Sequence, residues 1–275
     1  MLSFIEAKNA VSKELREVEI ILRDMGKNFN QSSAKEIFDY FFKSPGKYLR
    51  PTLAILSAKA IKPHMTIEER TQLINLCVAV ELIHSASLVH DDIIDNDLFR
   101  RGQKTLNNIY GRKVAVLAGD TFYAKAFSIL LNFPTRDAEQ TITQIIEKMC
   151  IAEIEQAQNN EISKQDYLNI IKGKTAAFMG ACCKLGAKVV EAKEEDIIAL
   201  ENFGLNFGMV YQIMDDCVDG DTNAIRNNIT IENAKEFATK ANYDIDNLEP
   251  SLYKQGLISL LNYVLEASNS KTKKA

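Results

Sequence analysis

Three carboxylates occur close together at Asp91, Asp92 and Asp95, directly after a long apolar run. On a helix, residues three and four apart are neighbours, so the three side chains gather on one side. Unpaired anions at this spacing repel one another unless a cation bridges them. Mg²⁺ suits this role because it takes oxygen ligands and shares them with substrate phosphates.

A second cluster, Asp215, Asp216 and Asp219, repeats the spacing and again follows an apolar run. A single cluster of this kind is as consistent with a solvated helix face as with a metal site. Two clusters favour metal binding, because facing carboxylates could hold several Mg²⁺ ions and clamp a polyphosphate between them.

A bound diphosphate also needs permanent positive charge, which arginine supplies as bidentate contacts and lysine as a point charge. Candidates are Lys47 and Arg50 around a tight turn, Arg100 and Arg101 after the first acidic cluster, and Lys174 before a helix of small residues. Each alone could be a solvated surface charge. Their positions at turns and helix ends favour a binding role.

His84 lies seven residues before Asp91, two helical turns away on the same face. A lone histidine on an apolar helix is more often a core residue than a ligand. We retain it as a candidate diphosphate contact.

The composition indicates a helical protein. The chain has 275 residues, 46% of them hydrophobic and 25% charged, with only 12 glycines and 5 prolines. These values favour an all-α fold in a single domain spanning residues 1–275, with a frayed tail over 268–275. The net charge of −4 argues against nucleic-acid binding. Five cysteines without a metal-type spacing and a charged N-terminal stretch favour a cytoplasmic protein with reduced thiols.

Hydrophobic periodicity and capping residues place the helices. The predicted helices are Phe4–Met25, Ser32–Phe42, Pro51–Ile61, Thr66 into the first acidic cluster, Val114–Leu131, Thr135–Asn159, Ser163–Lys172, Ala176–Val190, Glu194–Asp219, Ile231–Ala241 and Leu248–Ala267. A polar loop or helix start is expected over Phe99–Asn108, and a kink near Gly173.

Taken in order, these motifs resemble those of the all-trans polyprenyl diphosphate synthases, over about residues 40 to 220. The matching segments are Gly46–Pro51, Glu81–Asp95, Arg100–Thr105, Gly119–Asp120, Lys172–Ala176 and Gly208–Asp219. The resemblance implies a single-domain bundle of long helices around a deep central cavity. It also implies an enzyme that adds isopentenyl diphosphate to an allylic diphosphate such as farnesyl diphosphate, with several Mg²⁺ ions.

The resemblance also implies residue roles. The implied Mg²⁺ ligands are Asp91, Asp92, Asp95, Asp215 and Asp216, supported by Asp219. The implied contacts to the allylic diphosphate are Arg100 and Lys174, and those to isopentenyl diphosphate are Lys47, Arg50, His84 and Arg101. The oxygens of Thr175 and Gln212 would face the developing carbocation. Asp91, Asp92, Lys174, Thr175, Gln212 and Asp215 are therefore the expected catalytic set.

Family members use the residues just before the first acidic cluster as a wall that limits product length. Here these are Ile83, Ala86 and Ser87, and the last two are small. The resemblance is thus to long-chain enzymes of the octaprenyl or heptaprenyl type, which make quinone side chains. Small residues could instead serve close helix packing.

The segment after Asp219 departs from the family pattern. Family members continue with a longer loop whose lysines close over the diphosphate, whereas Gly220–Asn228 here leads almost directly into the terminal helices. Either the closing loop is reduced, or residues are missing from this chain.

Three other functions compete with the long-chain interpretation. They are a short-chain farnesyl or geranylgeranyl diphosphate synthase, a terpene cyclase, and a non-catalytic subunit. The repeated acidic cluster and the Lys47/Arg50 pair argue against a cyclase. The resemblance further implies a homodimer, and a water-insoluble product implies transient membrane contact for its release.

Overall fold

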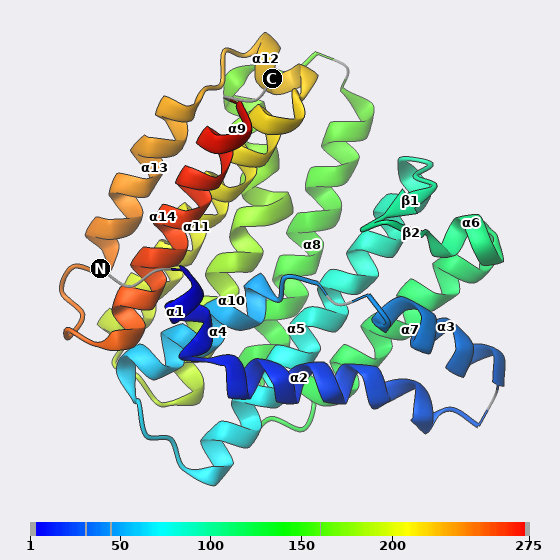
Figure 1. Ribbon diagram of the computed structural model, residues 1–275, viewed down its shortest axis with the longest axis horizontal. Helices are drawn as coiled ribbons and strands as arrows, with labels where there is room; N and C mark the ends of the chain where they lie inside the picture. Colours follow the sequence, from blue (N-terminus) through cyan, green and yellow to red (C-terminus); the bar gives the residue numbers. More distant parts are fainter. Residues whose placement is uncertain (1–3, 31, 45, 160, 273–275) are drawn as a thin grey trace.

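A computed structural model describes residues 4–30, 32–44, 46–159 and 161–272 and shows an all-α fold, as predicted (Figure 1). The α-helices are α1 (Phe4–Asn9), α2 (Ser12–Asp24), α3 (Ser32–Phe42), α4 (Leu49–Ile61), α5 (Ile67–Ile94), α6 (Leu106–Tyr110), α7 (Arg112–Leu130), α8 (Asp137–Gln158), α9 (Lys164–Ile171), α10 (Ala177–Val189), α11 (Glu194–Asp219), α12 (Thr222–Arg226), α13 (Ile231–Asp244) and α14 (Leu252–Thr272). The remaining elements are the 3-10 helix η1 (Met25–Asn28), the π-helical turn η2 (Lys172–Ala176), and the strands β1 (Phe99–Arg100) and β2 (Gln103–Lys104).

The long helix α5 is the central element of the core. It begins with a capping box in which the side chains of Thr66 and Glu69 each bond the other residue's backbone N–H. By length and composition α5 could cross a membrane, but 72% of its most apolar window is buried inside the fold. It is therefore the core helix of this bundle, with Glu81 and Asp92 among its few buried charged residues.

The helices that carry the two acidic clusters belong to one packed bundle. α5 packs against α7, and α10 packs against both α4 and α11. Figure 1 shows α8, α10 and α11 running in similar directions, while α2 runs across the view near the lower end of α5, which it contacts. The core includes the fully buried rings of Phe122, Phe178, Phe203 and Phe207. This packing brings the C-terminal ends of α5 and α11 to the same end of the molecule.

Several predicted boundaries were wrong. The first predicted helix is interrupted between α1 and α2, where the Ser12 hydroxyl donates to the carbonyl of Asn9 at 2.8 Å and so competes with the helical ladder. In the predicted loop or helix start over Phe99–Asn108, residues 99–104 instead form an antiparallel hairpin, because Arg101 and Gly102 adopt positive φ angles of 52° and 76° in a two-residue turn. The helix α6 does begin within this range, at Leu106. The last helix continues to Thr272, into the tail predicted to be frayed, and residues 273–275 lie outside the described part.

The predicted kink near Gly173 takes the form of a π-helical turn. Residues Lys172–Ala176 form η2, which follows directly after α9 and leads directly into α10. π-turns are rare and concentrate at functional sites. This turn presents Lys174 and Thr175 to the cavity described next.

Candidate active site

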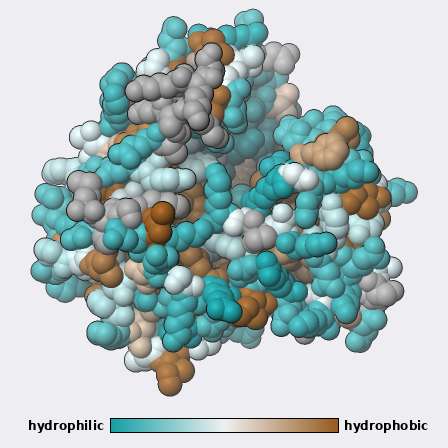
Figure 2. Space-filling view, in the orientation of Figure 1, coloured by the Kyte–Doolittle hydropathy of each residue, from teal (hydrophilic) through white to brown (hydrophobic). Residues whose placement is uncertain are grey.

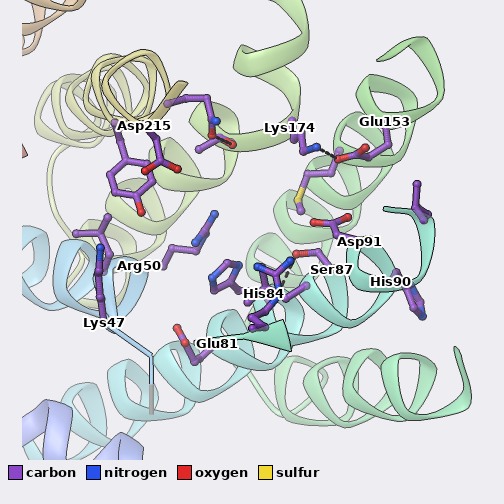
Figure 3. Close-up of a pocket in the computed structure, with 18 of the residues that line it drawn as sticks. Lys47, Arg50, Glu81, His84, Ser87, His90, Asp91, Glu153, Lys174 and Asp215 are labelled. Atoms are coloured by element: carbon purple, nitrogen blue, oxygen red, sulfur yellow. Dashed lines mark hydrogen bonds and ion pairs between the residues drawn. The ribbon is translucent and has the colours of Figure 1, made fainter. Parts of the chain in front are cut away.

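A cavity of about 700 Å³ opens where α5, α8, η2 and α11 meet the turn before α4 (Figure 3). The predicted site residues that line it are Lys47, Arg50, His84, Ser87, Asp91, Arg100, Arg101, Lys174, Thr175, Gln212 and Asp215. Residues from five separate segments of the sequence therefore meet at one place. The cavity has a cationic end near α4 and an acidic end near the C-terminus of α5.

A strained turn shapes the cationic end. Tyr48, the N-cap of α4, adopts a left-handed φ of 52°, which is uncommon for a non-glycine residue. Next to it, Gly46 lies so close to Arg101 that a Cβ atom there would be 2.8 Å from the guanidinium. The turn thus places Lys47 and Arg50 on the same side of the cavity as Arg101.

Two side-chain nitrogen atoms at this end are enclosed without a hydrogen-bond partner among the described residues. They are Arg50 Nε and His84 Nδ1. An unpaired buried polar group costs about 1–3 kcal/mol, so such groups mark places where a ligand completes the bonding. Burial, together with the nearby Arg50, lowers the pKa of His84 well below its usual range. His84 is therefore neutral at physiological pH.

Glu81 is a site residue to which the sequence analysis assigned no role. Its side chain lines the cavity and is only 4% exposed. Burial raises its pKa to about 6, while Arg50 and Arg101 act in the opposite direction. It is therefore a carboxylate at neutral pH and balances the two arginines. Its position one helical turn before His84 was a usable signal.

At the acidic end, Asp91 from α5 and Asp215 from α11 line the same cavity. Burial, together with the neighbouring Glu153, raises the pKa of Asp91 to about 6. Asp95 caps the C-terminus of α5 and is exposed, and Asp219 ends α11 at the surface. Oxygen ligands from two facing helices are a donor set that fits Mg²⁺ bound together with a phosphate group.

The second aspartate of each cluster lies outside the cavity lining and contacts protein groups, while its ligand role stays a prediction. Asp92 is 3% exposed, lies outside the cavity lining and pairs with Arg100. Asp216 also lies outside the lining and accepts hydrogen bonds from Tyr167 and Gln212. The reason is geometric, since successive helical residues point about 100° apart.

Arg100 lines the cavity, but its charge is directed to α5 rather than into open space. Besides Asp92, it lies 3.5 Å from Asp97. Within the described ranges, no three His, Cys, Asp or Glu side chains are close enough together to hold an ion. Asp91 and Asp215 are thus assembled around the cavity rather than against each other.

Lys174 is held by Glu153, a residue that the sequence analysis missed. The Lys174 ammonium pairs with Glu153 of α8 and lies 3.3 Å from Gln156 Oε1 (Figure 3). Burial lowers the pKa of Lys174, but the Glu153 carboxylate outweighs it and the net shift is upward. The lysine therefore stays charged while facing the cavity. Glu153 lies in a helix whose polar residues follow an ordinary pattern, so the sequence around it did not indicate a role in the site.

Thr175 and Gln212 are joined directly, as their implied shared role requires. The Thr175 hydroxyl donates to Gln212 Oε1 at 2.8 Å. The backbones of η2 and α11 approach closely here, because Gly208 has no side chain: a Cβ atom there would lie 2.5 Å from Ala176 Cα.

Only one of the three predicted chain-length residues lines the cavity. Ser87 does so, whereas Ile83 and Ala86 are fully buried beside it. Tyr123 of α7 and Met149 and Cys150 of α8 also line the cavity.

The segment after Asp219 is a compact connection. Gly220 ends α11 with a left-handed φ of 70°, and α12 follows at once, capped by Asp221. The Asn227 amide donates to the carbonyl of Ile162 at 3.0 Å, which ties the segment to the residues before α9. This part of the chain is packed against the bundle rather than extended over the cavity.

Comparisons with known proteins agree with this architecture. The chain is 33% identical over 207 residues to a short chain isoprenyl diphosphate synthase of Methanocaldococcus jannaschii, covering 70% of this chain and 63% of that protein. It spans less than two thirds of the length of the curated relatives it matches most strongly.

Solved structures share the fold. A decaprenyl diphosphate synthase from Rhodobacter capsulatus superposes with a TM-score of 0.86 at 22% identity, over 96% of this chain and 99% of that one. A polyprenyl synthase from Caulobacter crescentus CB15, complexed with calcium and isoprenyl diphosphate, superposes with a TM-score of 0.85 at 20% identity, over 96% of this chain and 97% of that one. Residues 31–228 match the polyprenyl synthetase family, and the chain therefore belongs to that family.

Proposed function

We propose that the protein is a Mg²⁺-dependent prenyltransferase that joins isopentenyl diphosphate to an allylic diphosphate such as farnesyl diphosphate. The observation that carries this proposal is the division of one cavity into two ends. One end offers cations and unpaired donors, and the other offers carboxylates from two helices. Two diphosphates can bind there, one directly to the protein and one through metal.

The chemistry follows from these positions. Lys47, Arg50, His84 and Arg101 bind the diphosphate of isopentenyl diphosphate. Asp91 and Asp215 would hold Mg²⁺, which would supply charge neutralisation for the departing allylic diphosphate. As that C–O bond breaks, the oxygens of Thr175 and Gln212 face the allylic cation, and the enclosed cavity excludes water from it. The double bond of isopentenyl diphosphate attacks the cation, and the released diphosphate takes the proton that is lost.

For the product, we propose a long polyprenyl diphosphate of the kind used in quinone side chains. Support comes from Ser87, a small side chain in the lining, and from Ala86 beside it. A chain that grows past Ser87 must displace the packing around Ile83, which closes that direction. The solved decaprenyl diphosphate synthase has the same fold.

A short-chain product is the second candidate and has support of its own. The relatives that match this sequence include proteins named short chain isoprenyl and geranylgeranyl diphosphate synthases. In addition, Ile83 and Ala86 are closed off from the cavity. This candidate predicts a product that ends at the level of Ser87.

One assay tests the function and separates the two products. The purified protein is incubated with Mg²⁺, farnesyl diphosphate and radiolabelled isopentenyl diphosphate, and products are resolved by chromatography. The proposal expects diphosphate release and a long linear product, which Ala86→Phe shortens. Unchanged length in the variant contradicts the long-chain proposal. A cyclic hydrocarbon indicates a cyclase, and no diphosphate release leaves a non-catalytic subunit.

The proposed partner is a second copy of the chain, in the cytoplasm. Hydrophobic side chains lie exposed on the side that carries β1 and α6 (Figure 2), where Leu98 and Phe99 are 58% and 63% exposed. A homodimer would cover such a surface. Contact with a membrane would be transient and would serve release of the insoluble product.

A further inference from the structure

A continuous chain of hydrogen bonds links three elements beside the cavity. The Tyr167 hydroxyl of α9 donates to Asp216 Oδ2 at 2.5 Å. The Gln212 amide donates to the other oxygen, Asp216 Oδ1, at 2.7 Å, and Gln212 Oε1 accepts from the Thr175 hydroxyl at 2.8 Å. The chain therefore begins at Tyr167, 3% exposed, and ends at a hydroxyl in the cavity wall.

The order of donors and acceptors fixes the orientation of each group. Both carboxylate oxygens of Asp216 accept a protein donor, so the carboxylate cannot turn without breaking a bond. With its NH₂ group on Asp216, the Gln212 amide must present its oxygen to Thr175. Thr175 then spends its only proton on Gln212, which leaves the lone pairs of its hydroxyl oxygen for the cavity.

The backbone around the chain leaves little freedom to compensate. At Gly208 the backbones of α11 and η2 approach closely, so Gln212 and Thr175 cannot separate easily. Hydrogen bonds in series polarise one another, and this series contains an anion, Asp216, which accepts the bond from Gln212. The negative charge of Asp216 therefore increases the electron density on the Thr175 oxygen.

We propose that Tyr167 is a positioning residue for catalysis: by holding Asp216, it makes Gln212 and Thr175 present oxygen lone pairs to the carbon that becomes positive. This inference rests on the proposed function, because the positive charge arises only during prenyl transfer. Tyr167 itself is outside the cavity lining and acts only through Asp216. In this proposal Asp216 orients Gln212, while Asp215 faces the metal.

The test compares two ligands that differ only in charge. One is an allylic diphosphate analogue with an ammonium nitrogen at the carbon that becomes cationic, and the other is its neutral carbon isostere. Tyr167→Phe should reduce the preference for the ammonium analogue by about tenfold, the size expected for one hydrogen bond to a charged group. It should lower kcat by a similar factor with KM unchanged, and affinity for inorganic diphosphate should stay at the wild-type value.

The matched control is Tyr110→Phe, which also removes a hydroxyl that donates to a carboxylate, at 3.2 Å from Glu36 and outside the cavity lining. It should change neither the preference nor kcat. Asp216→Asn is an independent second variant, and it should also reduce the preference for the ammonium analogue.

The inference is overturned if Tyr167→Phe lowers the affinity for both analogues equally. It is also overturned if the preference of this variant for the ammonium analogue and its kcat both match those of the wild type. Those results would mean that Tyr167 has only a structural role. A wild-type protein that releases no diphosphate from its substrates would instead overturn the proposed function. The two failures are therefore distinguishable.

Discussion

The two ends of the cavity hold their charged side chains in opposite ways. At the cationic end, Arg50 Nε and His84 Nδ1 are enclosed and lack a partner among the described residues. At the acidic end, protein counter-charges are already in place, with Arg100 on Asp92 and Lys174 on Glu153. The cationic end can therefore accept an anion without rearrangement, whereas at the acidic end the cationic side chains are already paired with carboxylates.

This difference indicates how each diphosphate would be bound. Enclosed donors need no rearrangement, so the cationic end can bind an anion without metal. The acidic end has carboxylates around the cavity, and these disfavour an anion until a divalent cation is present. A ligand there must also draw Lys174 away from Glu153. Three substitutions test the contrast, in order of decreasing expected effect.

Asp91→Asn should have the largest effect, because it removes a carboxylate that faces the cavity from α5. Loss of a metal ligand removes several kcal/mol of transition-state stabilisation, so kcat/KM should fall about 1000-fold. Mg²⁺ titrations of the rate should show a higher requirement. The exposed Asp246 provides a control, Asp246→Asn, expected to behave as wild type. An unchanged Mg²⁺ requirement would remove Asp91 from the metal site.

Arg50→Met should weaken isopentenyl diphosphate binding about 100-fold, as expected for removal of one partner from an enclosed charge pair. The binding should be measurable by calorimetry without Mg²⁺, since this end does not depend on metal. Affinity for the allylic diphosphate should change little. Arg136→Met, at an exposed arginine, serves as the control. Equal weakening of both substrates would erase the distinction between the ends.

Glu81→Gln should alter the pH dependence of stability. The pKa of Glu81 is raised from 4.5 to about 6, chiefly by burial. Because this pKa is raised on folding, the contribution of the Glu81 carboxyl group to stability is present below pH 4.5 and is lost as the pH rises through 6. The loss amounts to about 2 kcal/mol. Urea unfolding should therefore show that the free energy of unfolding of the variant, relative to that of the wild type, increases by about that much between pH 4.5 and pH 7.

Glu249→Gln, at an exposed glutamate, is the control for this measurement and should show no such gain. If Glu81→Gln and the wild type differ in free energy of unfolding by the same amount at both pH values, the two arginines fully compensate the effect of burial on Glu81.

The sequence alone determined the chemistry of the site to a large extent. The repeated acidic clusters identified Asp91 and Asp215, and the placement of cations at turns identified Lys47, Arg50 and Lys174, all of which line the cavity. That these side chains would be candidates for one site was predictable because residue type and helical spacing are local properties.

Only the tertiary structure decided which members of each cluster face the cavity. Asp92 and Asp216 share the spacing of Asp91 and Asp215 but turn toward Arg100 and Tyr167. Helical periodicity sets the angle between neighbouring side chains. It does not set the rotation of the helix against its neighbours, which depends on packing with α7 and α10. For the same reason Glu81, Glu153 and Tyr167 acquired their roles only when residues distant in sequence were brought into contact with them.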